Sequence, residues 1–269
     1  GAVLDGSVTG GLGNDTLNFA NSATVITVSL TGLGTGGVGF DGITNSVMTG
    51  SFTSIDTVIG GSGDDTLAGL ANAAGTWAVD TTSVYVSTNT LDFSGIDNLT
   101  GSDQADTFNV NVSATVDIVA GDGADQFTVA GGAVISGTLD GGAGIDDFDF
   151  NGVITLPTID GGADSDTLDL SDGTNAVNVS LDNVTNVEFL IGTAQGDTLT
   201  GTSGADAFEI VGSNDNGTVN STVTFSSFEN LAGAGGADSF KFPSGLGLTG
   251  SIDGGADVDV IDYSQYSTG

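Results

Sequence analysis

The chain of 269 residues contains no cysteine and no histidine, and its only basic residue is Lys241. Without cysteine, disulfides and thiolate metal sites are excluded. Without His, Cys or Arg, there is no catalytic triad, no thiol nucleophile and no basic clamp for acidic sugars, so the sequence predicts no enzyme activity. A two-carboxylate glycosidase needs only acidic residues, but the loop pattern described below accounts better for each aspartate.

Positive charge is almost absent, whereas 35 acidic residues give a net charge of −34. Nucleic acid is excluded as a partner because phosphate binding needs Lys and Arg. No apolar run approaches the roughly 20 residues that cross a bilayer, so no membrane insertion is expected. Hydrophobic residues still make up 38% of the chain. This combination predicts an apolar interior with carboxylates gathered at an edge, and cations as partners.

What the chain has in abundance is glycine, with 46 residues, many of them in segments such as "GGLGNDTLN" and "GGAGIDDFD". Alignment on the pattern G-x-x-G-x-D-x-apolar gives ten segments, with Ala120 in place of the first glycine and Gln104, Asp164, Gln195 and Asp257 in place of the second. They start at Gly10, Gly60, Gly101, Ala120, Gly141, Gly161, Gly192, Gly201, Gly233 and Gly254. Position six is always aspartate: Asp15, Asp65, Asp106, Asp125, Asp146, Asp166, Asp197, Asp206, Asp238 and Asp259. Position eight is always large and apolar: Leu17, Leu67, Phe108, Phe127, Phe148, Leu168, Leu199, Phe208, Phe240 and Ile261.

Between these loops the sequence alternates apolar and polar residues, as in "TVITVSL" and "DTFNVNV", which predicts strands. No helix is expected, because glycines interrupt every 3.6-residue apolar stripe. Most intervals between loops lie near one or two multiples of twenty residues. The sequence therefore predicts an all-β fold, a right-handed parallel β-solenoid with about 20 residues per coil.

A longer duplication lies over the short one. "FTSIDTVIGGSGDDTL" is answered by "VTNVEFLIGTAQGDTL" 132 residues later, and residues 245–269 restart the pattern of residues 1–25. We expect one continuous segment, residues 1–269, with internal modules of about 1–131 and 132–244 and the start of a third at 245–269. The last coil is unfinished, which predicts head-to-tail continuation with further repeats or identical subunits.

The loop composition suits calcium. Glycines permit positive φ, so that consecutive carbonyls turn toward one point, and the aspartate adds a carboxylate there. The expected ligands are the ten position-six aspartates and carbonyls near Gly11, Gly13, Gly61, Gly63, Gly121, Gly123, Gly142, Gly144, Gly162, Gly204, Gly236 and Gly255. Carboxylates about 5 Å apart would otherwise repel by roughly 3 kcal/mol per pair at an effective dielectric near 20. The alternative is that each aspartate only caps its own turn through hydrogen bonds.

These segments resemble the hemolysin-type (RTX) calcium-binding repeat, G-G-x-G-x-D-x-U-x, which "GGLGNDTLN", "GGSGDDTLA" and "GGAGIDDFD" match at every specified position. The resemblance implies parallel β-rolls with several Ca²⁺ ions held between turns, in secreted bacterial toxins, proteases, lipases, adhesins and surface-layer proteins. Two departures stand out. Only Gly192 and Gly201 are nine residues apart, and Gln104 and Gln195 occupy position four, where we expect empty or distorted loops.

The sequence thus predicts a calcium-binding structural segment of a secreted bacterial cell-surface protein, as an adhesin stalk, an extracellular filament or a surface layer. Two alternatives remain open at this point. One is a ligand-binding solenoid for carbohydrate or ice, which would need a flat, regular face. The other is the carboxy-terminal repeat region of a secreted enzyme.

Overall fold

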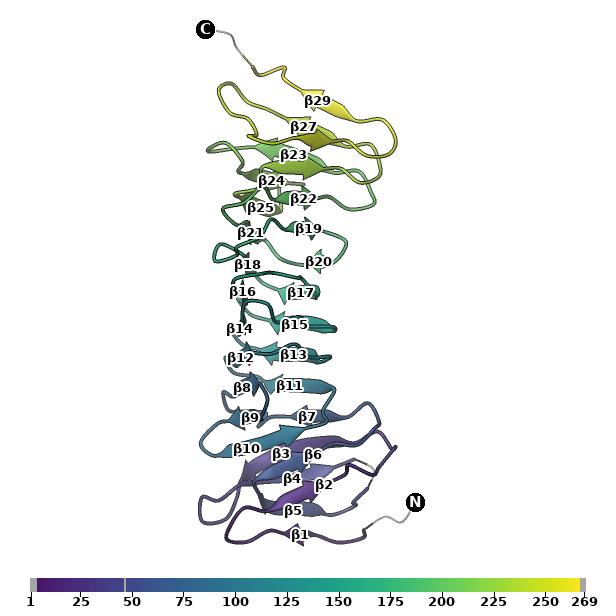
Figure 1. Ribbon diagram of the computed structural model, residues 1–269, viewed down its shortest axis with the longest axis vertical. Helices are drawn as coiled ribbons and strands as arrows, with labels where there is room; N and C mark the ends of the chain where they lie inside the picture. The colour runs from purple at the N-terminus through teal and green to yellow at the C-terminus, as the bar shows by residue number, and fades with distance from the viewer. Residues whose placement is uncertain (1–3, 46, 267–269) are drawn as a thin grey trace.

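The computed structural model describes residues 4–45 and 47–266. Within these ranges the chain forms 29 short strands and no helix, and no helix is therefore long and apolar enough to cross a membrane. The strands stack along the long axis of an elongated molecule, with the two termini at opposite ends (Figure 1). The expectation of an all-β chain is confirmed for the described residues.

The strands form three sheets. The ten-stranded sheet has the order β1 (Val8–Thr9), β5 (Ser51–Ile55), β4 (Phe40–Thr44), β3 (Thr27–Leu33), β7 (Thr66–Ala68), β11 (Asn98–Ser102), β13 (Asp117–Asp122), β15 (Thr138–Ala143), β17 (Thr158–Ala163), β20 (Val184–Thr185). The fifteen-stranded sheet has the order β2 (Thr16–Asn18), β6 (Thr57–Ile59), β10 (Thr90–Ser94), β9 (Ser83–Val86), β8 (Thr76–Val79), β12 (Thr107–Val110), β14 (Gln126–Val129), β16 (Asp147–Phe150), β18 (Thr167–Asp169), β21 (Phe189–Ile191), β25 (Val223–Ser226), β24 (Gly217–Val219), β23 (Ala207–Ile210), β27 (Ser239–Lys241), β29 (Val260–Asp262). The third sheet has the order β19 (Asn178–Ser180), β22 (Thr198–Thr200), β26 (Asn230–Ala232), β28 (Ile252–Asp253).

The middle of the molecule is built from coils, a term we use for a stretch that gives one strand to each of two sheets and joins them by a glycine-rich loop. The coil of β15 and β16 is an example. Its strands pair in parallel with β13 and β14 on one side and with β17 and β18 on the other. Loop aspartates that are 19, 21 and 20 residues apart in the sequence lie in successive coils here.

The strands are not parallel throughout, which corrects the expectation of a purely parallel ladder. Three three-stranded meanders are antiparallel: β3–β4–β5, β8–β9–β10 and β23–β24–β25. The first and third strands of each meander run in the same direction, so the parallel pairing resumes on both sides. The extra strands lie within long intervals between loops, which explains why those intervals exceed one coil.

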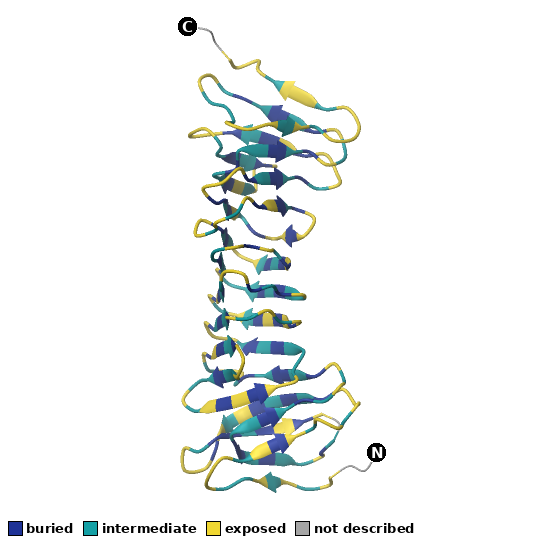
Figure 2. Cartoon of the chain, viewed as in Figure 1, coloured by how far each residue is buried: buried dark blue, intermediate teal, exposed yellow. Residues whose placement is uncertain are grey.

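Buried residues alternate with more exposed ones along strands such as β12, β14 and β16, and the buried side chains form the core (Figure 2). Trp77, Phe108, Phe127 and Phe148 stack face to face, with successive ring centroids 5.8, 5.1 and 4.5 Å apart. Their rings are fully buried. Each such aromatic pair contributes about 0.5–1.5 kcal/mol beyond the burial of its area, so the column ties neighbouring coils together.

The position-eight residues of the loop pattern confirm the predicted inward direction. Nine of the ten are buried, between 0 and 8% exposed, and the exception is Ile261, at 52%. Ile261 lies in β29, the last strand of its sheet, where the core column ends.

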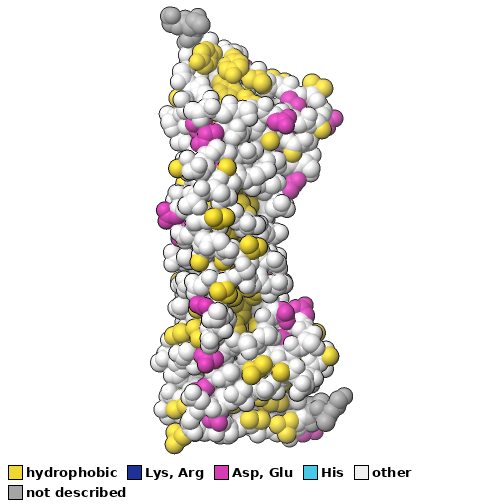
Figure 3. Space-filling view, viewed as in Figure 1, with side chains coloured by type: hydrophobic (Ala, Val, Ile, Leu, Met, Phe, Trp, Pro, Cys, Tyr) yellow, Lys and Arg dark blue, Asp and Glu magenta, His cyan; other side chains and the backbone are white. Residues whose placement is uncertain are grey.

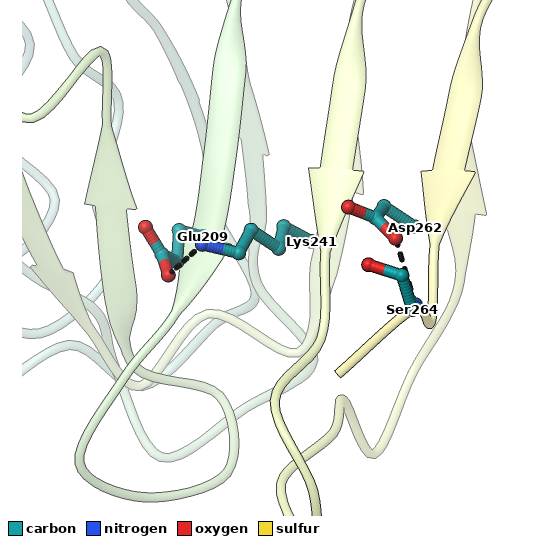
Figure 4. Close-up of polar contacts among 4 residues, drawn as sticks. All are labelled: Glu209, Lys241, Asp262 and Ser264. Carbon is teal, nitrogen blue, oxygen red and sulfur yellow. Dashed lines mark hydrogen bonds and ion pairs between the residues drawn. The ribbon is translucent and has the colours of Figure 1, made fainter. Parts of the chain in front are cut away.

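Lys241 lies in register between two acidic residues, Glu209 on β23 and Asp262 on β29 (Figure 4). Its Nζ is 2.7 Å from a carboxylate oxygen of Glu209, and both side chains are partly exposed. Hydrogen bonds from Ser264 lower the pKa of Asp262, and the charge of Lys241 adds a smaller lowering. Ion pairs this exposed typically contribute 0–1 kcal/mol, so the single basic residue does little to offset the acidic surface.

Candidate metal site

The position-six aspartates lie inside the loops and not at a solvent-facing edge, which corrects the sequence-based picture. Eight of them are at most 3% exposed: Asp65, Asp106, Asp125, Asp146, Asp166, Asp197, Asp206 and Asp238. Asp15 and Asp259, in the two end coils, are half-buried. A buried carboxylate is costly unless its oxygens find donors or a positive charge.

One oxygen of each central carboxylate accepts the backbone N–H of the corresponding residue in the preceding coil. Asp106 donates to Asp125 Oδ1 (2.6 Å), Asp125 to Asp146 Oδ1 (2.8 Å) and Asp146 to Asp166 Oδ1 (2.8 Å). The N–H of Asp166 donates in turn to Glu188 Oε2 (3.0 Å). The aspartates therefore form a continuous column that joins coil to coil.

The ten aspartates do not lie in one line. Asp206, Asp238 and Asp259 directly precede β23, β27 and β29 of the fifteen-stranded sheet and form a second column, joined by the same N–H to Oδ1 bonds of 2.8 and 3.0 Å. Asp65 and Asp197 precede strands of the other two sheets, and Asp15 precedes β2 at one end of the molecule. Stacking is thus shared among separate columns, the longest being the one from Asp106 to Glu188.

Four further acidic residues that the pattern does not include act as acceptors in these columns: Asp56, Asp97, Glu188 and Glu229. Their carboxylates accept the N–H groups of Asp15, Asp65, Asp166 and Asp197, respectively, at 2.8–3.0 Å. The 132-residue duplication contains the signal that would have found them. Asp56 aligns with Glu188 and Asp97 with Glu229, so both modules keep an acid at each position.

The second carboxylate oxygen divides the ten loops into two kinds. In four, which we call closed loops, Oδ2 accepts the N–H of the position-two residue: Gly61 to Asp65, Ser102 to Asp106, Thr193 to Asp197 and Thr202 to Asp206. Positions two and four of the closed loops have no positive φ. These carboxylates are satisfied by their own loops, as in the turn-capping alternative. The closed loops include those of Gln104 and Gln195, which need no left-handed backbone there.

In the other six, which we call open loops, positions two and four both have positive φ, from 69° to 137°. They are residues 10–15, 120–125, 141–146, 161–166, 233–238 and 254–259. In five of them Oδ2 is buried and has no hydrogen-bond partner among the described residues: Asp15, Asp125, Asp146, Asp166 and Asp238. An oxygen of this kind needs something besides these residues to satisfy it: a cation, a proton on the carboxyl group or a buried water.

Consecutive open loops lie against one another. Gly121, Gly142 and Gly162 pair in register at the ends of β13, β15 and β17, and Gly123 donates its N–H to the carbonyl of Ala143 (2.7 Å). The Cα of the first glycine packs on the carboxylate, since a Cβ at Gly141 would lie 2.3 Å from Asp146 Oδ2. Position one is glycine in nine of the ten loops, Ala120 being the exception, and at Gly141 a methyl group would collide with the carboxylate.

Burial and neighbouring charge raise the pKa values of these carboxyls. Desolvation is the largest cause, and it raises the pKa of Asp125 to about 7 and that of Asp166 to about 6. The pKa values of Asp146 and Asp238 are also raised, again mainly by burial. Within the described residues no three acidic side chains converge on one point. A cation here would therefore take a carboxylate oxygen from one or two aspartates and its remaining ligands from loop carbonyls, a set that suits Ca²⁺.

No family model matches the chain, and no curated protein matches it.

The raised pKa values predict a pH dependence in the absence of divalent ions. A carboxyl whose pKa is higher in the folded than in the unfolded chain holds more protons when folded, so stability falls as the pH rises between the two values. We expect the free energy of unfolding in EDTA to fall by about 2 kcal/mol between about pH 5 and pH 8. Chemical denaturation followed by Trp77 fluorescence measures this. The Asp125→Asn/Asp166→Asn variant should lose most of the slope, and a flat wild-type profile would contradict the assignment.

Proposed function

We propose that the chain is a calcium-binding structural segment of a secreted bacterial surface protein, folded as a right-handed parallel β-solenoid with about 20 residues per coil. The observation that carries the proposal is the set of five buried Oδ2 atoms to which no group in residues 4–45 and 47–266 donates, all in open loops. Three of them, in Asp125, Asp146 and Asp166, belong to consecutive coils.

The open loops would hold the ions. Asp125, Asp146 and Asp166 would supply Oδ2, and carbonyls of adjacent loops would supply the other oxygens, so each ion would bridge two coils. Ca²⁺ accepts six to eight oxygens in flexible geometry, whereas Mg²⁺ demands a near-ideal octahedron. The second column, with Asp238 and Asp259, offers the same arrangement. The closed loops of Asp65, Asp106, Asp197 and Asp206 would remain free of metal.

A structural role is supported by the same geometry. The loop aspartates bond to the backbone of adjacent coils and are buried, so they are not presented to a substrate. The secreted location is supported by the resemblance to the RTX repeat. Extracellular calcium, at millimolar levels, would then keep sites of modest affinity filled, as in other extracellular modules.

Thermal unfolding with added Ca²⁺ and then EDTA tests the proposal. A single site at a hundredfold excess over its Kd stabilises by about 2.7 kcal/mol, so several sites should raise the melting temperature by more than ten degrees. Equal Mg²⁺ should give much less. Circular dichroism and Trp77 fluorescence both report the transition. An unchanged melting temperature in Ca²⁺, Mg²⁺ and EDTA would refute the calcium proposal. Protonation would then remain as the way to neutralise the buried aspartates.

A further inference from the structure

The two ends of the molecule carry complementary unpaired groups. At the end near residue 4, β1 and β2 are outermost strands, each with one partner, and Asp15 Oδ2 is buried without a hydrogen-bond partner among the described residues. At the other end β28 and β29 are outermost. There the N–H of Asp259 has no carboxylate above it within the described residues, whereas each earlier aspartate of its column donates to the next.

The end coils also share the spacing of coils that do stack. An apolar strand residue lies seven positions before the aspartate, and core residues follow at two and four positions after it. In the end coils these residues are Val8, Asp15, Leu17 and Phe19, and Ile252, Asp259, Ile261 and Tyr263. In two stacked central coils they are Leu139, Asp146, Phe148 and Phe150, and Ile159, Asp166, Leu168 and Leu170, and the corresponding strands pair in parallel.

The exposed end of the core column leaves an apolar surface. Ile261 is 52% exposed, although the equivalent residues of the central coils are fully buried, and Tyr263 is 54% exposed. Tyr263 stacks on Phe242, with ring centroids 5.1 Å apart, so its outer face is where the next ring of the column would lie. A hollow of about 420 Å³ adjoins these side chains. Hydrophobic side chains are visible at this end in Figure 3.

We propose that the end face of β28 and β29 binds the end face of β1 and β2 of a second copy of this chain, in parallel register. Ile252 would pair with Val8 of the second copy, and Val260, Ile261 and Asp262 with Thr16, Leu17 and Asn18. The N–H of Asp259 would then donate to the carboxylate of Asp15, and Phe19 would continue the aromatic column beyond Tyr263. Open loop 254–259 would lie on open loop 10–15.

Charge opposes this association, because each copy carries a net charge of −34. At physiological ionic strength the screening length is about 8 Å, so repulsion between exposed carboxylates on two copies is reduced while contact between the end faces is not. The association should therefore strengthen as salt is raised. It does not depend on calcium in the open loops, although an ion between loops 254–259 and 10–15 would add to it.

Disulfide trapping tests the register, and the absence of cysteine gives a clean background. Thr16 and Val260 are exposed and would be direct neighbours across the junction, at a distance that a disulfide spans. The Thr16→Cys/Val260→Cys variant should form a covalent ladder of dimers, trimers and longer species under mild oxidation. The control variant, Thr16→Cys/Val258→Cys, moves one thiol two residues out of register. It should form at least tenfold less covalent dimer and longer species.

Sedimentation of the uncrosslinked chain gives a second measurement. Ile261→Lys should weaken self-association at least tenfold, whereas Val153→Lys, at an exposed apolar position away from the end coils, should leave it unchanged. Both experiments are run in Ca²⁺ and in EDTA. No ladder in either condition, or equal ladders from the two cysteine pairs, would overturn the inference. Calcium binding is measured separately by the melting temperature, so either proposal can fail without the other.

Discussion

Replacing Gly141 with alanine is expected to destabilise the protein by roughly 2–4 kcal/mol, a large change for one methyl group. The new Cβ would lie 2.3 Å from Asp146 Oδ2 and 2.6 Å from the carbonyl oxygen of Gly161. Neither neighbour can move freely, because the carboxylate is held by the N–H of Asp125 and the carbonyl belongs to the next coil. Thermal or urea denaturation followed by Trp77 fluorescence measures the loss.

Gly196→Ala is the matched control for this prediction. Gly196 also precedes a loop aspartate, but a Cβ there meets no atom within 4 Å and its φ is not positive. The change should be neutral or stabilise by up to about 1 kcal/mol, since alanine restricts the unfolded chain. If both variants lose the same stability, the contact between glycine and aspartate does not explain why glycine recurs at position one of the loops.

Asp125→Asn should have opposite effects with and without calcium. The asparagine retains an oxygen for the N–H of Asp106 and replaces the unpartnered Oδ2 with a neutral group. At pH 8 in EDTA we expect it to stabilise the chain by about 1–2 kcal/mol, because the pKa of Asp125 is raised to about 7 and its ionised form is disfavoured by burial. In saturating calcium it should instead destabilise, because a charged ligand is lost.

Asp172→Asn controls for net charge, because Asp172 is exposed and lies outside the loop pattern. It removes the same single charge and should change stability by less than about 0.5 kcal/mol in either condition. Measuring the stability of both variants with and without calcium separates the loss of the buried carboxylate from the loss of one unit of net charge. A stabilising effect of Asp125→Asn in both conditions would mean that the column is neutralised by protons, and the calcium proposal would then fail for this site.

Much of the local structure follows from sequence pattern. Alternation predicts strands, and the residue two positions after each loop aspartate is buried in nine of ten cases because strand side chains alternate between the interior and the surface. The four loops from Gly101 to Gly161 do lie in consecutive coils. These features depend on a few neighbouring residues, and period-two patterns encode them directly.

The direction of the aspartates could not be read in the same way. A carboxylate in a glycine-rich loop suits a solvent edge by composition, yet the loop wraps around it because its oxygens replace backbone acceptors between coils. The difference between open and closed loops is similarly hidden. Gly63 and Gly204 occupy position four in closed loops without positive φ, whereas Asp164 and Asp257 adopt positive φ in open ones. Residue type permits the left-handed backbone there but does not impose it.

The antiparallel meanders were missed because their strands carry the same alternation as the parallel ones. Whether a strand runs parallel or antiparallel to its neighbour depends on which strand edges are still unpaired after the chain turns. That depends on the whole sheet and not on the local sequence. In the meander β8–β9–β10, Tyr85 packs on Trp77 and its hydroxyl accepts the N–H of Leu70 (3.1 Å). These contacts form only when the chain folds back on itself, and a local period in the sequence does not reveal them.

The meanders also bear on how the rod would yield to a pull on its two ends. A simple coil of about twenty residues releases roughly 70 Å of chain when it peels away from its neighbour. The meander β8–β9–β10 cannot be peeled strand by strand in chain order, because β8 lies beyond β10 and β9 in the sheet and is released only after them. The molecule would therefore lengthen in unequal steps. The coils of the middle would unfold one at a time, whereas each meander would resist until its three strands come apart together.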